Sequence, residues 1–134
     1  MKYKKSITIL IGLLIAVILF HIAVIIKVIP YDIAWGGRLQ NDSEMYVFEA
    51  ISILINLFLG LVLLMKGDYI KYRLMDKTID IILWIFLALF ALNTVSNICA
   101  KTNFEKSLAV LTLVFAILIW KILKMKNIIN TNKS

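Results

Sequence analysis

The sequence has almost no cysteine, histidine or proline, and each shortage excludes a class of protein. Its 134 residues include one cysteine, one histidine and one proline. A lone thiol, Cys99, excludes an internal disulfide and any metal site built from several cysteines. We interpret Cys99 as a small apolar side chain near a helix end. Because there is also no His-x-x-Glu type of pair, the sequence predicts no metal site and no cofactor.

Charge is scarce as well. Charged residues make up 17% of the chain, hydrophobic residues make up 62%, and the mean hydropathy is +0.93. A soluble domain is nearer roughly 25% charged and half apolar. Four apolar runs each approach the ~20 residues that a helix needs to cross a hydrocarbon layer about 30 Å thick. These runs cover about residues 7–29, 46–65, 79–100 and 104–122.

The four runs predict an all-α membrane protein, an antiparallel bundle of four transmembrane helices. They use most of the chain, so we expect one transmembrane domain over residues 1–126. Residues 127–134 form a polar cytoplasmic tail that we expect to be loose.

The net charge of +7 comes from 15 basic and 8 acidic residues that are unevenly placed. Three basic residues precede the first run, four lie between the second and third, and four lie at or after the end of the fourth. Only Lys27, Arg38, Lys101 and Lys106 lie on the other side. This positive-inside pattern predicts a multi-pass protein of the cell membrane with both termini in the cytoplasm. Anionic lipid headgroups account for the basic side, so we expect no nucleic-acid partner.

The first run combines a face of small residues with the only histidine. Gly12 and Ala16 form a small-xxx-small pair, which lets a neighbouring helix approach closely. His21 lies off that face, in the outer half of the helix. It is either a functional group within the membrane or a structural imidazole that is hydrogen-bonded to another helix. Pro30 lacks an N–H group, so we expect the first helix to end there.

The loop over residues 31–43 is polar and aromatic, and we interpret it as an interfacial loop. We expect Trp35 to lie in the headgroup layer, while Arg38 meets Asp32 or a lipid phosphate. Gly36-Gly37 allows a tight turn, but the Lys-Ser/Thr tail of a phosphate-binding loop is absent.

Polar residues follow one face of the second run. Glu49, Ser52, Asn56 and Gly60 are separated by three, four and four residues, so they form a stripe on a helix. An unsatisfied polar group facing lipid costs several kcal/mol, so this stripe is expected to face the bundle. Glu49 either has a buried role or extends to the headgroups. The segment 41–44, Asn-Asp-Ser-Glu, is typical of a helix start.

The third and fourth runs meet in a polar hairpin. Asn93, Ser96, Asn97, Ala100 and Lys101 share one face, and we expect Asn93 and Asn97 to hydrogen-bond across helices. The segment 102–105, Thr-x-x-Glu, is a capping box that opens the fourth helix after a very short turn. The fourth helix then continues a small and polar stripe through Glu105, Ala109, Thr112 and Ala116.

The hairpin also carries a resemblance to a known family. Asn93-Thr94-x-x-Asn97 followed by Ala100-Lys101-Thr102-x-Phe104-Glu105-Lys106 resembles a signature of uncharacterised small bacterial four-helix integral membrane proteins. The similarity continues back to Trp35-Gly36-Gly37-Arg38 and to Phe48-Glu49. It implies four membrane spans and implies no activity.

The polar residues give two hypotheses of function. Glu49, Asn56, Asn93, Asn97 and His21 are expected to meet in the outer half of the bundle as a ligand or ion site. No serine or cysteine has a base nearby in sequence, so we expect no catalytic residue and no enzyme. The first hypothesis is an accessory protein, or one that binds a ligand, a membrane-protein partner or a second copy of itself. The alternative is a small oligomeric proton- or cation-coupled transporter or channel that uses Glu49. Further candidates at the interface and in the loops are Asp32, Trp35, Arg38, Lys101 and Glu105.

Overall fold

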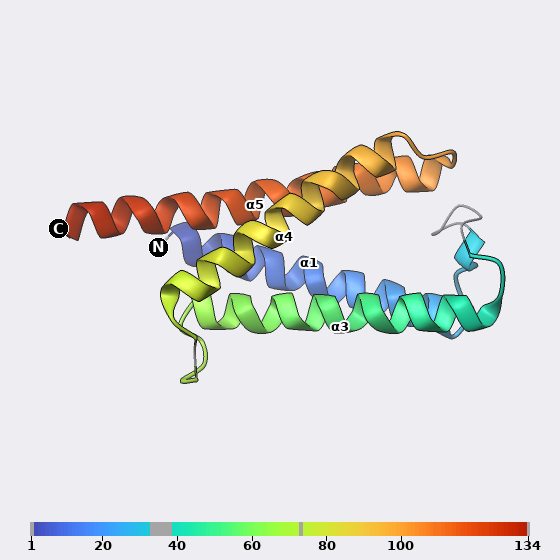
Figure 1. The fold of residues 1–134 in the computed structure, drawn as a ribbon, viewed down its shortest axis with the longest axis horizontal. Helices are drawn as coiled ribbons and strands as arrows, with labels where there is room; N and C mark the ends of the chain where they lie inside the picture. The colour runs from blue at the N-terminus through green and yellow to red at the C-terminus, as the bar shows by residue number, and fades with distance from the viewer. Residues whose placement is uncertain (1, 33–38, 73, 134) are drawn as a thin grey trace.

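The computed structural model describes residues 2–32, 39–72 and 74–133, and it describes the side chains of these residues between positions 4 and 124. Four long helices fill this part of the chain (Figure 1). They are α1 (Lys2–Ile25), α3 (Asp42–Lys66), α4 (Asp76–Ile98) and α5 (Asn103–Lys133). Each contains a segment that is long and apolar enough to cross a membrane. The predicted fold class, an all-α protein with four candidate spans, is therefore confirmed.

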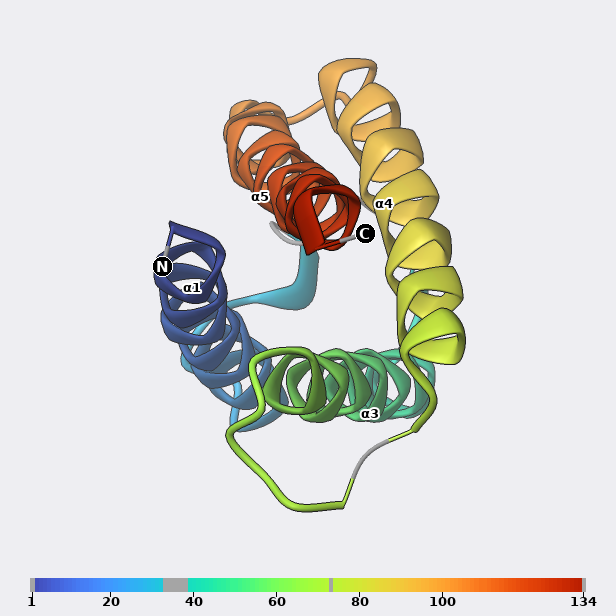
Figure 2. The same ribbon diagram turned by 90° about the vertical axis from the view of Figure 1, so that its left-hand side faces the viewer.

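The helices form a four-sided bundle. α1 packs against α3 and α5, and α4 packs against the same two helices, in the order that the end-on view shows (Figure 2). Both chain termini and the loop between α3 and α4 lie at one end of the bundle, which we name the terminal end (Figure 1). The turn after α1 and the turn between α4 and α5 lie at the opposite end, the hairpin end. The halves of the bundle nearest these ends are the terminal half and the hairpin half.

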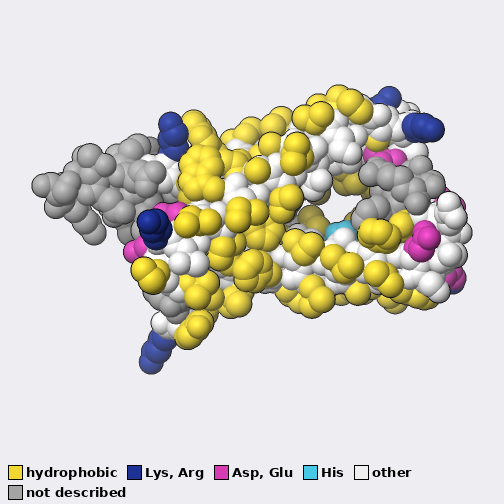
Figure 3. Space-filling model, viewed as in Figure 1, with side chains coloured by type: hydrophobic (Ala, Val, Ile, Leu, Met, Phe, Trp, Pro, Cys, Tyr) yellow, Lys and Arg dark blue, Asp and Glu magenta, His cyan; other side chains and the backbone are white. Residues whose placement is uncertain are grey.

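The outer surface of the bundle is apolar between its two ends. Only 22% of the most apolar part of α1, α3 and α4, and 33% of that of α5, is buried within the protein. Hydrophobic side chains cover much of the middle of the molecule, and lysine and arginine lie near its ends (Figure 3). A helix that is apolar on both its inner and outer faces is suited to hydrocarbon rather than water. The chain is therefore a multi-pass membrane protein.

Side-chain caps start two of the helices, as the sequence predicts. Asn41 Oδ1 accepts a hydrogen bond of 2.9 Å from the Glu44 N–H at the start of α3. Thr102 Oγ1 accepts one of 3.2 Å from the Glu105 N–H at the start of α5, and its hydroxyl donates to Glu105 Oε1 at 3.0 Å. These bonds satisfy backbone donors that the first turn of a helix otherwise leaves unpaired.

The first helix ends earlier than Pro30, so the predicted boundary near residue 29 is wrong. α1 ends at Ile25, and Lys27 follows in the left-handed conformation with φ 65°. The Lys27 N–H donates to the Val24 carbonyl at 3.0 Å, and the Val28 N–H donates to the Ala23 carbonyl at 2.9 Å. This is a Schellman closure, which satisfies the last carbonyls of the helix before the proline is reached.

Two further expectations differ from the structure. α5 continues as a helix to Lys133, although a loose tail is predicted from residue 127. Residues 123–133 contain no glycine or proline, so no strong helix breaker stops the helix. The small-residue face of α1 is not covered by a neighbouring helix, since a Cβ atom added at Gly12 would meet nothing within 4 Å.

The terminal half contains a continuous hydrophobic core. All four helices contribute buried side chains to it, including Ile7 of α1, Leu63 of α3, Leu83 of α4 and Ile119 of α5, each 0% exposed. Next to this core, Lys66 at the end of α3 is 1% exposed and forms an ion pair with Asp80 of α4. The core and this pair hold the terminal ends of the helices together.

Candidate functional site: a polar cavity in the hairpin half

A cavity of about 520 Å³ lies in the hairpin half, and all four helices contribute to its walls. Phe86 of α4 and Phe115 of α5 lie both on the cavity wall and in the hydrophobic core, so they mark the boundary between the two. In the space-filling view, an opening is visible between α3 and α4, with the one histidine of the chain at its edge (Figure 3). The cavity is therefore accessible from the side of the bundle.

The five residues predicted to form the site all line this cavity. α1 provides His21, α3 provides Glu49 and Asn56, and α4 provides Asn93 and Asn97. The helical spacing in each run places these side chains on the inward face, and the order of the helices then brings the faces together. That they bind a ligand or an ion stays a prediction.

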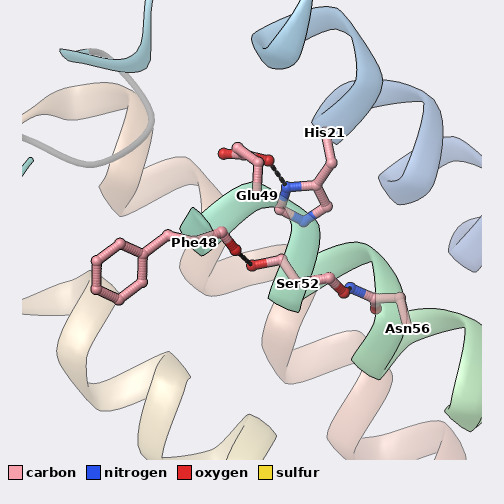
Figure 4. Close-up of polar contacts among 5 residues, drawn as sticks. All are labelled: His21, Phe48, Glu49, Ser52 and Asn56. Atoms are coloured by element: carbon pink, nitrogen blue, oxygen red, sulfur yellow. Dashed lines mark hydrogen bonds and ion pairs between the residues drawn. The ribbon is translucent and has the colours of Figure 1, made fainter. Parts of the chain in front are cut away.

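His21 and Glu49 form a polar contact between two helices on the cavity wall. His21 Nδ1 lies 2.5 Å from Glu49 Oε2, and the two side chains reach one another from α1 and α3 (Figure 4). The Glu49 side chain is 0% exposed and that of His21 is 15% exposed. Glu49 is thus buried within the bundle, and His21 is hydrogen-bonded to a neighbouring helix. The contact joins α1 to α3 within the membrane span.

From Glu49 toward the terminal end, the polar stripe of α3 continues with side chains that hydrogen-bond to the backbone of their own helix. Ser52 Oγ donates to the Phe48 carbonyl at 2.8 Å, and Asn56 Nδ2 donates to the Ser52 carbonyl at 2.7 Å (Figure 4). These bonds use donors that would otherwise be unpaired in an apolar environment. The Asn56 Oδ1 and Ser52 Oγ oxygens remain on the cavity wall as acceptors.

The expectation that Asn93 and Asn97 hydrogen-bond across helices is wrong. Among the described residues, neither amide has a side-chain hydrogen bond, although both line the cavity. The polar link between α4 and α5 is made by Thr94, whose Oγ1 lies 2.8 Å from Thr112 Oγ1. One residue along a helix is a rotation of about 100°, so Thr94 faces α5 while Asn93 faces the cavity.

The site predicted from the sequence does not include three polar residues of the cavity wall or the buried Thr94. Ser52, Ser96 and Thr112 also line the cavity, and all three lie on the polar stripes of their runs. Their positions on these stripes could therefore have added them to the predicted site. Thr94 lies off the predicted face, and only the position of α5 shows that it is 7% exposed.

Three of the candidates at the interface and in the loops, Asp32, Lys101 and Glu105, lie apart from the described part of the cavity wall. Asp32 and Lys101 are exposed, and Glu105 is 2% exposed at the start of α5, where it bonds to Thr102. Trp35 and Arg38 lie outside the described residues, so the predicted contact of Arg38 with Asp32 or a phosphate stays a prediction.

The cavity wall offers hydrogen bonds rather than a set of metal ligands. Within the described residues, no group of three histidine, cysteine, aspartate or glutamate side chains is close enough to hold a metal ion. The wall combines amides and hydroxyls with one imidazole–carboxylate pair, and apolar side chains such as Leu13 and Phe90 fill the spaces between them. Such a lining suits a small molecule that has both an apolar and a hydrogen-bonding part.

Fold and cavity together define a polytopic membrane protein with four candidate spans and a polar cavity among them. Comparison of the chain with models of protein families, with curated proteins and with solved structures finds no match. No family is therefore identified, and the resemblance to small bacterial four-helix membrane proteins stays a prediction.

Proposed function

We propose that this protein is an accessory or ligand-binding membrane protein, and that its cavity holds the polar end of a small ligand. The observation that carries the proposal is the meeting of polar side chains from all four helices on the wall of one cavity. A cavity of about 520 Å³ is within the range of roughly 300–1,000 Å³ that is usual for small-molecule sites.

The amides of Asn93 and Asn97 support this role. Packing alone does not account for them, since neither has a side-chain partner among the described residues. Asn93 is exposed and Asn97 is half-buried on the cavity wall, so both amides can bond to a hydrogen-bonding group that enters the cavity. Ligand binding is thus a physical reason for placing two amides on this wall.

Binding can be tested with three amphiphiles that share a decyl chain: decylamine, decanol and decanoate. The protein is reconstituted in phosphatidylcholine nanodiscs, and its melting temperature is measured as each compound is added. A ligand at 100 times its Kd stabilises a protein by about 2.7 kcal/mol, so a saturable rise in melting temperature is expected for at least one compound.

Two asparagine variants, one on the cavity wall and one away from it, test whether the rise in melting temperature depends on the cavity. Asn93→Leu/Asn97→Leu removes both amides from the cavity and should abolish most of the rise. Asn103→Leu changes an exposed asparagine that is not on the cavity wall and should retain it. If none of the three compounds gives a saturable rise, or if both variants respond like the wild type, the cavity does not bind ligands of this kind.

For the orientation, we propose that the terminal end faces the cytoplasm of the cell. Eleven of the fifteen basic residues belong to the ends and loop of that side, as the positive-inside rule requires. In a Cys99→Ala background, an impermeant maleimide should label Asn41→Cys but not Tyr72→Cys in intact cells. Both positions are exposed, so the opposite labelling pattern would reverse the orientation.

A second candidate function is favoured by the burial of Glu49. Its carboxyl group is 0% exposed within a candidate span and contacts His21, and intramembrane ionisable pairs occur in proton and cation pathways. For a transporter or channel, Glu49→Gln should remain folded and lose a proton, cation or drug flux that the wild type shows in liposomes. A wild type without flux, together with a Gln variant of lowered stability, would leave Glu49 a structural role only.

A further inference from the structure

We infer that the ligand enters the cavity sideways from the membrane, through the opening between α3 and α4, and that it is a single-chain amphiphile with an amine or hydroxyl head. This inference rests on the proposed ligand-binding function. It adds the route of entry and the chemical class of the ligand.

The route follows from where an aromatic contact bridges each of two seams of the bundle. Along the seam of α1 and α5, Phe20 and Phe104 stack with their ring centroids 5.7 Å apart. Along the seam of α3 and α4, Phe58 and Phe86 meet at 6.2 Å near the middle of the bundle. Beyond this pair, α4 turns away from α3 toward α5 (Figures 1 and 2), and the space-filling view is open at this point (Figure 3).

Exposed residues of the cavity wall on both α3 and α4 lie at the depth of lipid chains rather than of headgroups. Ile55 of α3 and Leu89 of α4 line the cavity, and they are 46% and 45% exposed. At 1.5 Å per residue, Ile55 lies about 20 Å and Leu89 about 14 Å along the helix axis from the hairpin ends of α3 and α4. A molecule that crosses this opening must therefore already be dissolved in the hydrocarbon layer.

The wall decides the chemistry of the head. His21 and Glu49 are the ionisable groups on the wall among the described residues, and they pair with each other. The other polar groups are neutral amides and hydroxyls. An anionic head would lie beside the Glu49 carboxyl group without a lysine or arginine from the described part of the wall, and a buried unpaired charge is costly. An amine or hydroxyl head can donate to the acceptor oxygens of Asn56, Asn93 and Asn97, and the positive charge of an amine would lie beside the Glu49 carboxyl group.

The apolar part of the wall decides the tail. Leu13, Val17, Phe90 and Leu111 come from three helices and line the same cavity as the polar groups. The volume of about 520 Å³ is that of a site for one small ligand, which favours one chain over the two chains of a bilayer phospholipid. The remainder of a longer chain can extend through the opening into the lipid.

The test uses a thiol placed on the cavity wall. Ser96→Cys in a Cys99→Ala background is nearly isosteric, and Ser96 lines the cavity. In phosphatidylcholine nanodiscs, the thiol is reacted with membrane-dissolved N-decylmaleimide, and the alkylation rate is measured by mass spectrometry. Adding Leu89→Trp narrows the opening and should slow the reaction several-fold. Adding Leu92→Trp, which places the same side chain on the lipid-facing surface of α4, should leave the rate unchanged.

Decylamine and decanol should protect the thiol from the maleimide, whereas decanoate should not. If the compounds protect but Leu89→Trp slows the reaction no more than Leu92→Trp does, lateral entry is wrong and ligand binding stands. If decanoate protects as well as the others, the assigned head chemistry is wrong. If none of the three protects, the proposed ligand-binding function fails with the inference. Should Leu89→Trp not fold, as judged by gel filtration, Ile55→Trp narrows the same opening from α3.

Discussion

The terminal half and the hairpin half of this bundle are built from the same four helices, and yet they are filled in opposite ways. In the terminal half, inward positions hold side chains such as Leu10, Leu63 and Ile122, each 0% exposed, and these form a continuous core. In the hairpin half, the corresponding faces hold Glu49, Asn93 and other polar residues around a cavity of about 520 Å³. The difference separates two tasks: the terminal half holds the helices together, and the hairpin half leaves a space between them.

Physical chemistry explains why the two fillings do not mix. Branched apolar side chains interdigitate at high density, and each fills the space that its neighbours leave. Amides and carboxyl groups within a membrane require hydrogen-bond partners in fixed directions, which dense packing seldom supplies. A half of the bundle that is rich in such groups therefore tends to remain hollow unless a ligand or water completes their bonds.

The largest effect is expected at the ion pair of the terminal half. Lys66→Met keeps a long apolar side chain but leaves Asp80 without the buried lysine. Removing one partner of a buried pair typically costs 3–5 kcal/mol, and because the Asp80 side chain is 29% exposed, we expect about 3 kcal/mol. The free energy of unfolding in mixed micelles, measured by SDS titration, checks this value.

The paired variant Lys66→Met/Asp80→Asn distinguishes a lost charge partner from lost packing. Replacing both members of a buried pair is often nearly neutral, so the second change should restore much of the lost stability. Equal losses in the single and paired variants would mean that Lys66 stabilises the terminal half through its packing alone.

The next effect compares the same truncation on both sides of the boundary. Leu83 is 0% exposed in the core, whereas Leu89 lines the cavity on the same helix and is 45% exposed. Leu→Ala in a packed core costs roughly 2–5 kcal/mol. We expect about 2 kcal/mol for Leu83→Ala, because the unfolded state in micelles is also apolar, and less than about 1 kcal/mol for Leu89→Ala. Similar losses in SDS titration would show that the hairpin half is packed as tightly as the terminal half.

A smaller effect is expected from the polar groups between α4 and α5. Thr94→Val removes the hydroxyl contact with Thr112 and should lower the free energy of unfolding by about 0.6–1.7 kcal/mol, the range for hydrogen bonds between membrane helices. Asn93→Leu/Asn97→Leu should leave it nearly unchanged, since these amides bond to no described residue. A larger loss in the asparagine variant than in Thr94→Val would assign the amides to packing and not to the cavity.

The architecture could be predicted because it depends on local features of the sequence. Run length and apolar content are sufficient to place four spans, and the caps at Asn41 and Thr102 are local motifs whose partners lie three residues away. The inward face of α3 also follows from spacing, since Glu49, Ser52 and Asn56 recur once per helical turn.

The unpredicted features depend on contacts between segments that are distant in sequence. Spacing alone does not show that His21 lies 2.5 Å from Glu49, that Thr94 and not Asn93 meets α5, or that Lys66 pairs with Asp80. The Schellman closure at Lys27 was missed for another reason: a lysine with positive φ has no sequence signal as strong as that of glycine.

The smallest effect on stability is expected from the exposed ion pair of Lys27 and Asp42 at the hairpin end. Lys27 Nζ lies 2.5 Å from Asp42 Oδ2, and both side chains are about half exposed. The hydrogen bond and then the charge of Asp42 raise the pKa of Lys27 above its ordinary value of 10.5. The pair therefore stabilises the folded state fully below pH 10.5, and this stabilisation is lost as the pH rises through the higher pKa of the folded protein.

The difference in melting temperature between the wild type and Asp42→Asn isolates this pair from the other lysines and tyrosines that titrate at high pH. We expect a difference of a degree or so at pH 8, because exposed ion pairs contribute little, and it should shrink above pH 10.5. Asp42 is also the first residue of α3, where a negative charge favours the helix dipole independently of Lys27. A difference that stays constant through pH 11 would assign the effect of Asp42 to the dipole and leave the hairpin end without a stabilising contribution from this ion pair.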